Sequence, residues 1–113
     1  MSKESTDSIR YLQEQIIAFR DERDWAQFHT PKNTAANIAV EAGELLDAYR
    51  WKEEASDSQA VSEEAADVLY ALLLFCQAEQ IDIGDELIKK LAKNAHKYPV
   101  DKAKGNNGKY HEL

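Results

Sequence analysis

The sequence has few of the residues on which several fold and function classes depend. Cys76 is the single cysteine, which excludes a disulfide framework and a cluster of thiolate metal ligands. Four glycines and two prolines in 113 residues leave few interruptions to long helices. No apolar run approaches the roughly 20 residues that a membrane-spanning helix needs, and no signal-peptide core follows the polar start. We therefore expect a cytoplasmic protein.

Acidic residues outnumber basic residues, and the two kinds are unevenly distributed along the chain. The formal net charge is −7, which disfavours nonspecific binding to a nucleic-acid backbone. Nine acidic residues fall within residues 41–67, against Arg50 and Lys52. Residues 89–110 contain seven lysines and one acid, Asp101. The pattern indicates an acidic pole and a basic pole, although two solvated faces would give the same pattern.

The periodicity of apolar residues predicts four helices and no sheet. Ile9, Leu12, Ile16 and Phe19 recur at helical spacing in the first helix. Thr30 and Pro31 suit the cap and first position of the second, and Asp82 can cap the fourth. We predict an all-α four-helix bundle forming a single domain over residues 1–113, with residues 1–7 and the last few residues flexible. The predicted helices cover about residues 9–23, 32 or 33 to 52, 61–80 and 83–98. Ile83, Leu87 and Leu91 mark the buried stripe of the last.

Two pairs of acids lie three residues apart beside apolar helix stripes. Glu41 and Glu44 flank the stripe of the second helix, and Glu64 and Asp67 extend that of the third. Desolvated carboxylates are costly unless they are paired, protonated or bound to metal. Two such pairs on packed helices would surround one point with oxygen donors, which suits Mg²⁺ or Mn²⁺.

Gly43 lies between the first two acids. A glycine inside a helix costs about 1 kcal/mol relative to alanine, so its presence suggests that a helix or ligand approaches closely. Surface acids beside a core are the competing interpretation, and they would explain either pair alone. A ferritin-like di-iron site requires Glu-x-x-His, and no histidine of this chain lies three residues after a glutamate.

These motifs and their surroundings resemble the MazG-like, all-α nucleoside triphosphate pyrophosphohydrolases, in particular their dCTP-pyrophosphatase branch. EAGE and EAAD match the E-x-x-E…E-x-x-D signature of that family. The likeness extends from about Ile9 to Leu113. It includes the stretches RDERDWAQFHTPKN, YRWK, DVLYALL and KNAHKYPVDKAKGNNGKYHEL.

The resemblance implies Mg²⁺-dependent hydrolysis of a nucleoside triphosphate to a monophosphate and pyrophosphate. It implies a tetramer built as a dimer of dimers, with sites lined by more than one subunit. The Mg²⁺ ligands would be Glu41, Glu44, Glu64 and Asp67, with Mn²⁺ as a possible substitute. One of the glutamates, with Glu41 and Glu44 as candidates, would also activate the attacking water. The preferred substrate would be a deoxynucleotide such as dCTP.

The resemblance also implies residues that hold the nucleotide. Trp25, Phe28, His29 and Trp51 would hold the base and sugar. The run K-x-x-x-N-x-x-[KR]-Y is matched by Lys90, Asn94, Lys97 and Tyr98, which would grip the phosphates, with Lys109 and Tyr110 from the tail as further candidates. Lys90, Asn94 and Lys97 share one helix face.

The chain departs from the branch at two positions that help line the nucleotide pocket. Relatives carry a histidine where this chain has Ile16, and a tyrosine where it has Ala71, beside Tyr70. These departures leave the preferred base open between dCTP, dATP and modified pyrimidines. A protein of another class, a non-catalytic metal-binding helical oligomer or partner-binding module, would carry the same acid cluster.

Overall fold

The computed structural model describes residues 8–50, 52–54 and 57–112, and every regular element in these ranges is helical. The prediction of an all-α protein is therefore confirmed. The described elements are α1 (Ile9–Glu22), η1 (Ala26–Phe28), α2 (Pro31–Asp47), α3 (Ser58–Glu79), α4 (Ile83–Lys97), α5 (Val100–Ala103) and η2 (Tyr110–Glu112). Trp51 and residues 1–7, for which we made predictions, lie outside these ranges.

The chain divides into two compact units, Met1–Ile81 and Asp82–Leu113. The first contains α1, α2 and α3, and the second contains α4, α5 and η2. A four-helix bundle within one domain stays a prediction, and each unit is described by itself. Among the described helices, none is long and apolar enough to cross a membrane.

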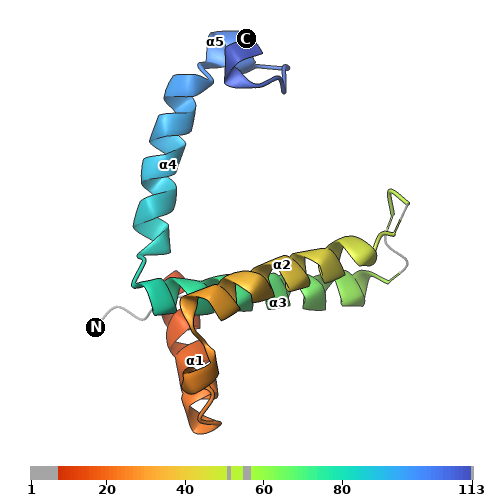
Figure 1. Ribbon diagram of the computed structural model, residues 1–113. Helices are drawn as coiled ribbons and strands as arrows, with labels where there is room; N and C mark the ends of the chain where they lie inside the picture. Colours follow the sequence, from red (N-terminus) through yellow and green to blue (C-terminus); the bar gives the residue numbers. More distant parts are fainter. Residues whose placement is uncertain (1–7, 51, 55–56, 113) are drawn as a thin grey trace. The chain divides into compact units, whose positions relative to one another are not determined.

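Helix α3 forms the centre of the first unit. It lies alongside α2 over much of its length and also packs on α1, which crosses it steeply (Figure 1). Its buried residues are Ala71, Leu73, Leu74 and Cys76, and Thr34 is the buried residue of α2. The Thr34 hydroxyl contacts the carbonyl oxygens of Thr30 and Pro31 at 2.9 and 3.0 Å, which satisfies its buried polar group.

Side chains that accept hydrogen bonds from backbone amides of the first turn mark where the helices begin. The Thr30 hydroxyl accepts a hydrogen bond from the Asn33 amide at 3.1 Å, and Pro31 takes the first helical position of α2. The Asp82 carboxylate accepts from the Asp85 amide at 3.1 Å at the start of α4. Both predicted caps are confirmed. Asp57 caps α3 by accepting from two backbone amides, so α3 begins three residues before its predicted start.

The predicted extension of α2 to Lys52 is wrong. The helix ends at Asp47, and the Ala48 amide bonds the Leu45 carbonyl three residues back, which tightens the last turn. Arg50 then adopts φ 56°, in the left-handed region that ends a right-handed helix. These backbone changes turn the chain into the connection to α3.

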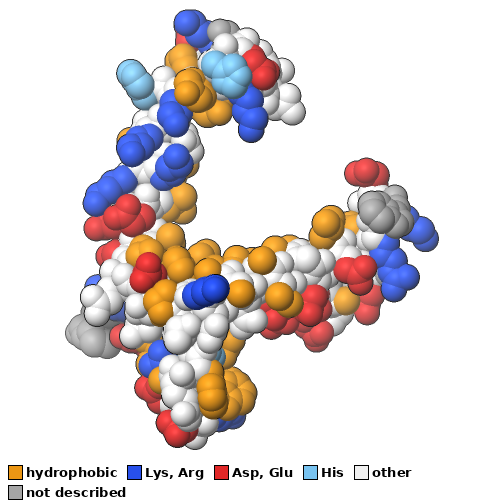
Figure 2. All heavy atoms as spheres, viewed as in Figure 1, with side chains coloured by type: hydrophobic (Ala, Val, Ile, Leu, Met, Phe, Trp, Pro, Cys, Tyr) orange, Lys and Arg blue, Asp and Glu red, His pale blue; other side chains and the backbone are white. Residues whose placement is uncertain are grey.

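The predicted buried stripe of α4 is not covered by the other elements of the second unit, so its burial stays a prediction. Leu87 is 55% exposed and Leu91 is 53% exposed, whereas Ile83 is half-buried. The described residues of this unit contain one short helix and one 3-10 turn besides α4, so its apolar side has few partners there. Basic side chains follow the same helix (Figure 2).

Candidate metal centre

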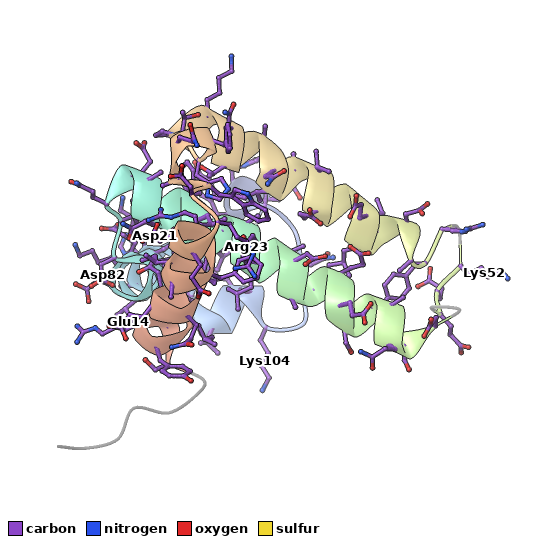
Figure 3. The ribbon with its side chains drawn as sticks, turned by 90° about the horizontal axis from the view of Figure 1, so that it is seen from below. Glu14, Asp21, Arg23, Lys52, Asp82 and Lys104 are labelled. Atoms are coloured by element: carbon purple, nitrogen blue, oxygen red, sulfur yellow. The ribbon has the colours of Figure 1, made fainter. Side chains whose placement is uncertain are left out.

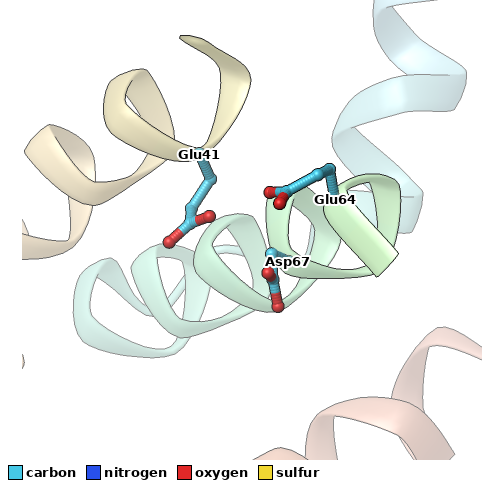
Figure 4. Close-up of side chains that lie close together, drawn as sticks. All are labelled: Glu41, Glu64 and Asp67. Carbon is cyan, nitrogen blue, oxygen red and sulfur yellow. The ribbon is translucent and has the colours of Figure 1, made fainter. Parts of the chain in front are cut away.

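Three of the four predicted acids converge between α2 and α3. One carboxylate oxygen from each of Glu41, Glu64 and Asp67 lies within 4.8 Å of the others. Glu41 reaches from α2 towards α3, where Glu64 and Asp67 lie one turn apart (Figure 4). Because α2 and α3 lie side by side, the i, i+3 spacing on α3 brings both of its acids towards Glu41.

The carboxylates of this cluster are partly desolvated and lack compensating partners. One oxygen each of Glu41 and Glu64 is buried, and neither has a hydrogen-bond partner among the described residues. The ion pairs formed within the described ranges lie elsewhere and join Arg20 to Asp21, Glu86 to Lys89, and Glu112 to His111. Buried polar oxygens without partners normally indicate a ligand, water or ion. A divalent cation would satisfy these oxygens.

The electrostatics of the cluster favour a cation as well. Burial raises the pKa of Glu41, and the carboxyl groups of Glu44, Asp67 and Glu64 raise this pKa further. Burial likewise raises the pKa of Glu64, with added repulsion from Glu44 and Asp67. A divalent cation would oppose both causes, because it pairs with the charged form of each carboxylate. The residues therefore fit a hard metal ion with oxygen ligands.

Glu44 lies beside the three converging acids. It is exposed on α2, and its carboxyl group acts on the pKa of both Glu41 and Glu64. The cluster of three does not include it. Its role as a metal ligand stays a prediction.

Gly43 has open space on its outer side. A Cβ atom built at this position would meet no described atom within 4 Å. The close approach of a neighbouring helix, which the glycine suggested, is therefore absent from the described part of the chain. A recess of about 420 Å³ lies there, lined by Gly43, Leu46, Asp47 and Arg50.

A second pocket adjoins the metal cluster, because Asp67 belongs to both. This pocket has a volume of about 460 Å³ and lies between α1 and α3. Two of its lining residues were singled out in the sequence analysis. Ile16 is the first position at which the chain departs from the dCTP-pyrophosphatase branch, and Tyr70 is next to the second. Ala71, by contrast, is buried in the core. The lining residues are Gln15, Ile16, Phe19, Asp67 and Tyr70.

Aromatic rings gather beside this pocket. Phe19 meets Trp25 edge-on at 5.8 Å and Tyr70 at 6.2 Å between ring centroids. The Arg23 guanidinium carbon lies 3.8 Å from the centre of the Phe19 ring, and its Nη1 donates to the Phe19 carbonyl at 2.8 Å. Figure 3 shows Arg23 beside α1. Arg23 is therefore held against the ring by two contacts.

The remaining predicted base-binding residues lie after α1. Phe28 is 59% exposed in η1, where a large apolar ring is free to meet a ligand or partner. His29 is half-buried, and its Nδ1 has no hydrogen-bond partner within the described ranges. Burial lowers the pKa of His29, and the charge of Arg20 lowers it further. Trp51 lies outside the described residues.

The predicted phosphate-binding residues lie in the second unit. Lys97 places its Nζ 5.1 Å from the centre of the Tyr110 ring, and Tyr98 meets the same ring edge-on at 6.3 Å. The end of α4 and the tail thus contact each other. Whether Lys90, Asn94, Lys97 and Tyr98 bind phosphate stays a prediction.

Sequence reasoning missed Gln15 and Arg23. A signal for Gln15 was present, because residues 15 and 19 are four apart and share a helix face. Arg23 follows the last residue of α1, where the apolar periodicity of the helix no longer predicts in which direction a side chain points.

The comparison with known families identifies the chain. Residues 36–113 match the model of the MazG-like family, a stretch that contains all four predicted acids. The chain belongs to the MazG-like family. This confirms the resemblance predicted from EAGE and EAAD.

Individual relatives of this MazG-like chain carry pyrophosphatase names. It is 33% identical to rat dCTP pyrophosphatase 1 over 116 residues, which cover 95% of the chain and 66% of the rat protein. It is 30% identical to bovine dCTP pyrophosphatase 1, covering 99% of the chain and 70% of the bovine protein. The chain also resembles the crystal structure of a pyrophosphatase from Archaeoglobus fulgidus, with a TM-score of 0.73 and 34% sequence identity. The match covers 88% of this chain and 99% of the archaeal chain.

Proposed function

We propose that this protein hydrolyses nucleoside triphosphates to nucleoside monophosphates and pyrophosphate in a Mg²⁺-dependent reaction. The observation that carries the proposal is the convergence of Glu41, Glu64 and Asp67, with two buried carboxylate oxygens that lack partners. The names of the rat, bovine and archaeal relatives support the same reaction class. The proposed substrates are deoxynucleotides such as dCTP, and the proposed role is cleansing of the cytoplasmic nucleotide pool.

The proposed division of labour follows from the positions of the acids. Glu41, Glu64 and Asp67 hold the ion, which when bound neutralises phosphate charge and aligns the triphosphate. Glu44 lies beside this group but outside the converging three, so it is our candidate for accepting a proton from the attacking water. Mn²⁺ is expected to substitute because it accepts the same oxygen ligands.

The proposed nucleoside position is the pocket between α1 and α3. Asp67 links this pocket to the carboxylate cluster, so phosphates at the cluster place the sugar and base beside Phe19 and Tyr70. Trp25, Phe28, His29 and Trp51 are the proposed additional contacts to base and sugar. Lys90, Asn94, Lys97 and Tyr98 are proposed to bind the phosphates.

A panel of canonical and modified ribo- and deoxynucleotides, assayed with and without Mg²⁺, tests the proposal. We expect pyrophosphate release that requires Mg²⁺ and falls at least 100-fold in Glu41→Gln. Asp47→Asn on the same helix removes one negative charge outside the cluster and is the matched control, with activity near that of the wild type. Phosphate release in place of pyrophosphate, or no turnover of any nucleotide, would contradict the proposal.

The second candidate is a non-catalytic helical oligomer whose acids bind metal for structure alone. The exposed apolar side chains of α4 favour an oligomer under either proposal. The two candidate functions predict different outcomes for the Glu41→Gln variant. A catalytic site loses pyrophosphate release while the fold persists, whereas a structural metal site loses thermal stability first.

A further inference from the structure

Asn107 is the one asparagine of the chain that a glycine follows. The other asparagines precede residues that carry a Cβ atom, and they are Asn33, Asn37, Asn94 and Asn106. Because glycine has no Cβ atom, the Gly108 nitrogen can approach the side-chain carbonyl carbon of Asn107 closely. Asn107 is exposed and lies between α5 and η2, outside any helix. An accessible side-chain amide therefore lies next to an unhindered backbone nitrogen.

The backbone of the helices protects three of the other asparagines. Asn33 and Asn37 lie within α2, and Asn94 lies within α4. The amide of Thr34, which follows Asn33, donates to the Thr30 carbonyl at 2.9 Å. An amide held in a helical hydrogen bond is directed along the helix axis and away from the side chain of the preceding residue. Attack of a backbone nitrogen on an asparagine side chain is therefore disfavoured in both helices.

The turn that contains Asn107 also restrains the nitrogen beside it. The Gly108 amide donates to the Asn106 side-chain oxygen, Oδ1, at 2.9 Å. The backbone that carries this oxygen is itself held in a turn, because Gly105 adopts φ 77° and the Asn106 amide donates to the Ala103 carbonyl at 2.9 Å. The Gly108 nitrogen must lose its proton before it can attack Asn107, so it must first leave the Asn106 oxygen.

We propose that Asn107 is a site of spontaneous deamidation and that the Asn106 side chain limits its rate in the folded protein. The deprotonated Gly108 nitrogen forms a bond to Asn107 Cγ, and the bond from Cγ to Nδ2 breaks. The nitrogen leaves as ammonia, with the proton that the Gly108 amide lost returned to it through solvent. One water molecule then opens the succinimide at either carbonyl group, which gives aspartate or isoaspartate.

The net reaction consumes one water, releases one ammonia and needs no oxidant or cofactor. It adds one negative charge two residues before Lys109, within the lysine-rich residues 89–110. The proposal goes beyond the proposed function and does not depend on it.

Mass spectrometry of the full-length protein, incubated in mildly alkaline buffer, tests the site. We expect a mass gain of about 1 Da that grows with time and is confined to the peptide that contains Asn107. Labelling by an isoaspartyl methyltransferase should detect isoaspartate alongside aspartate. No mass gain, an equal gain at the helical asparagines, or aspartate without isoaspartate would overturn the proposal.

The Asn106→Ala variant tests the restraint, because it removes the oxygen that accepts from Gly108 and keeps the Asn107-Gly108 pair. The folded variant should deamidate about fivefold faster than the folded wild type, since one ordinary hydrogen bond no longer has to open. In concentrated urea, where the turn is lost, the two proteins should react at the same rate. Equal rates in the folded proteins, or the same difference in urea, would overturn the role of Asn106.

Two further variants separate the acceptor from other effects of substitution. Asn106→Asp keeps an oxygen at the acceptor position, so it should deamidate no faster than the wild type. Gly108→Ala adds a Cβ atom beside the attacking nitrogen and should slow the reaction in urea, where crowding by the folded turn plays no part. A rate in Asn106→Asp equal to that in Asn106→Ala, or unchanged deamidation of Gly108→Ala in urea, would contradict the proposed chemistry.

Discussion

At the scale of single residues, the central feature is the mutual repulsion of carboxylates that have been partly removed from water. Burial raises the pKa of both Glu41 and Glu64, and neighbouring acids add to the effect. Such an arrangement costs stability in the metal-free protein and favours binding of a divalent cation. The spacing of the acids along the sequence predicted four residues, of which three meet. The burial of individual oxygens follows from the packing of α2 on α3.

Glu41→Gln should therefore affect the metal-free and the Mg²⁺-bound protein differently. Without metal, the variant should be at least as stable as the wild type, because one repelling charge is lost. Saturating Mg²⁺ should raise the melting temperature of the wild type by several degrees and that of the variant much less. Thermal denaturation with and without Mg²⁺ measures both effects. Equal stabilisation of the two proteins by Mg²⁺ would exclude Glu41 as a ligand.

His29 should make folding stability depend on pH. Its pKa lies below the ordinary value of 6.5 in the folded protein, first through burial and then through the charge of Arg20. As the pH falls below 6.5, the unfolded chain binds a proton that the folded chain does not, so the free energy of unfolding decreases. The raised pKa values of Glu41 and Glu64 act in the opposite direction over acidic pH, because there the folded state binds protons more readily.

Comparison of variants isolates the contribution of His29. Urea denaturation at pH 7.5 and 5.5 should show a smaller loss of stability in His29→Gln than in the wild type, because the acids are common to both. His96→Gln, at an exposed position of α4, is the control and should lose as much stability as the wild type. An equal loss in all three proteins would show that the His29 pKa is not lowered by folding.

At the scale of elements, the sequence predicted helix type and most helix beginnings, because caps and apolar periodicity are local signals. The hydroxyl of Thr30 and the carboxylate of Asp82 cap α2 and α4 as predicted. The end of α2 was misplaced because residues 48–52 continue the helical pattern, whereas Arg50 adopts a left-handed backbone. The pocket between α1 and α3 could not be predicted in full, because it depends on how two helices distant in sequence cross.

The cap of α3 offers a test at this scale. The Asp57 carboxylate accepts from the backbone amides of Gln59 and Ala60 at 3.0 and 3.4 Å. Asp57→Ala should lower the free energy of unfolding by about 1 kcal/mol, because these amides lose their partner at the helix end. Chemical denaturation measures the loss. Glu63→Ala, on the exposed side of the same helix, should change stability much less, and an equal loss would refute a specific capping role.

At the scale of the whole molecule, our proposal that the chain assembles is supported by exposed apolar side chains. Leu87, Ile88 and Leu91 of α4 are more than half exposed, as are Val40 and Leu46 of α2. Apolar residues gathered at helical spacing on one element are typical of an interface. We propose a tetramer built as a dimer of dimers, in which these side chains are covered by other subunits.

Analytical ultracentrifugation should therefore find a mass near four times 12.8 kDa for the wild type. Leu87→Asp combined with Leu91→Asp should shift the protein to smaller species, because charges at a buried interface are costly. Lys89→Asp, which also introduces an acid on α4 but on its polar side, should leave the assembly intact. A monomeric wild type would contradict the proposed assembly.

The most direct test of the central claim is the identity of the bond that is cleaved. Phosphorus-31 NMR of a reaction with dCTP and Mg²⁺ distinguishes the products without coupling enzymes. The account predicts dCMP and pyrophosphate in equal amounts, with no dCDP at any time. Formation of dCDP and phosphate, or an unchanged dCTP spectrum alongside an equally inert panel of other nucleotides, would contradict the account.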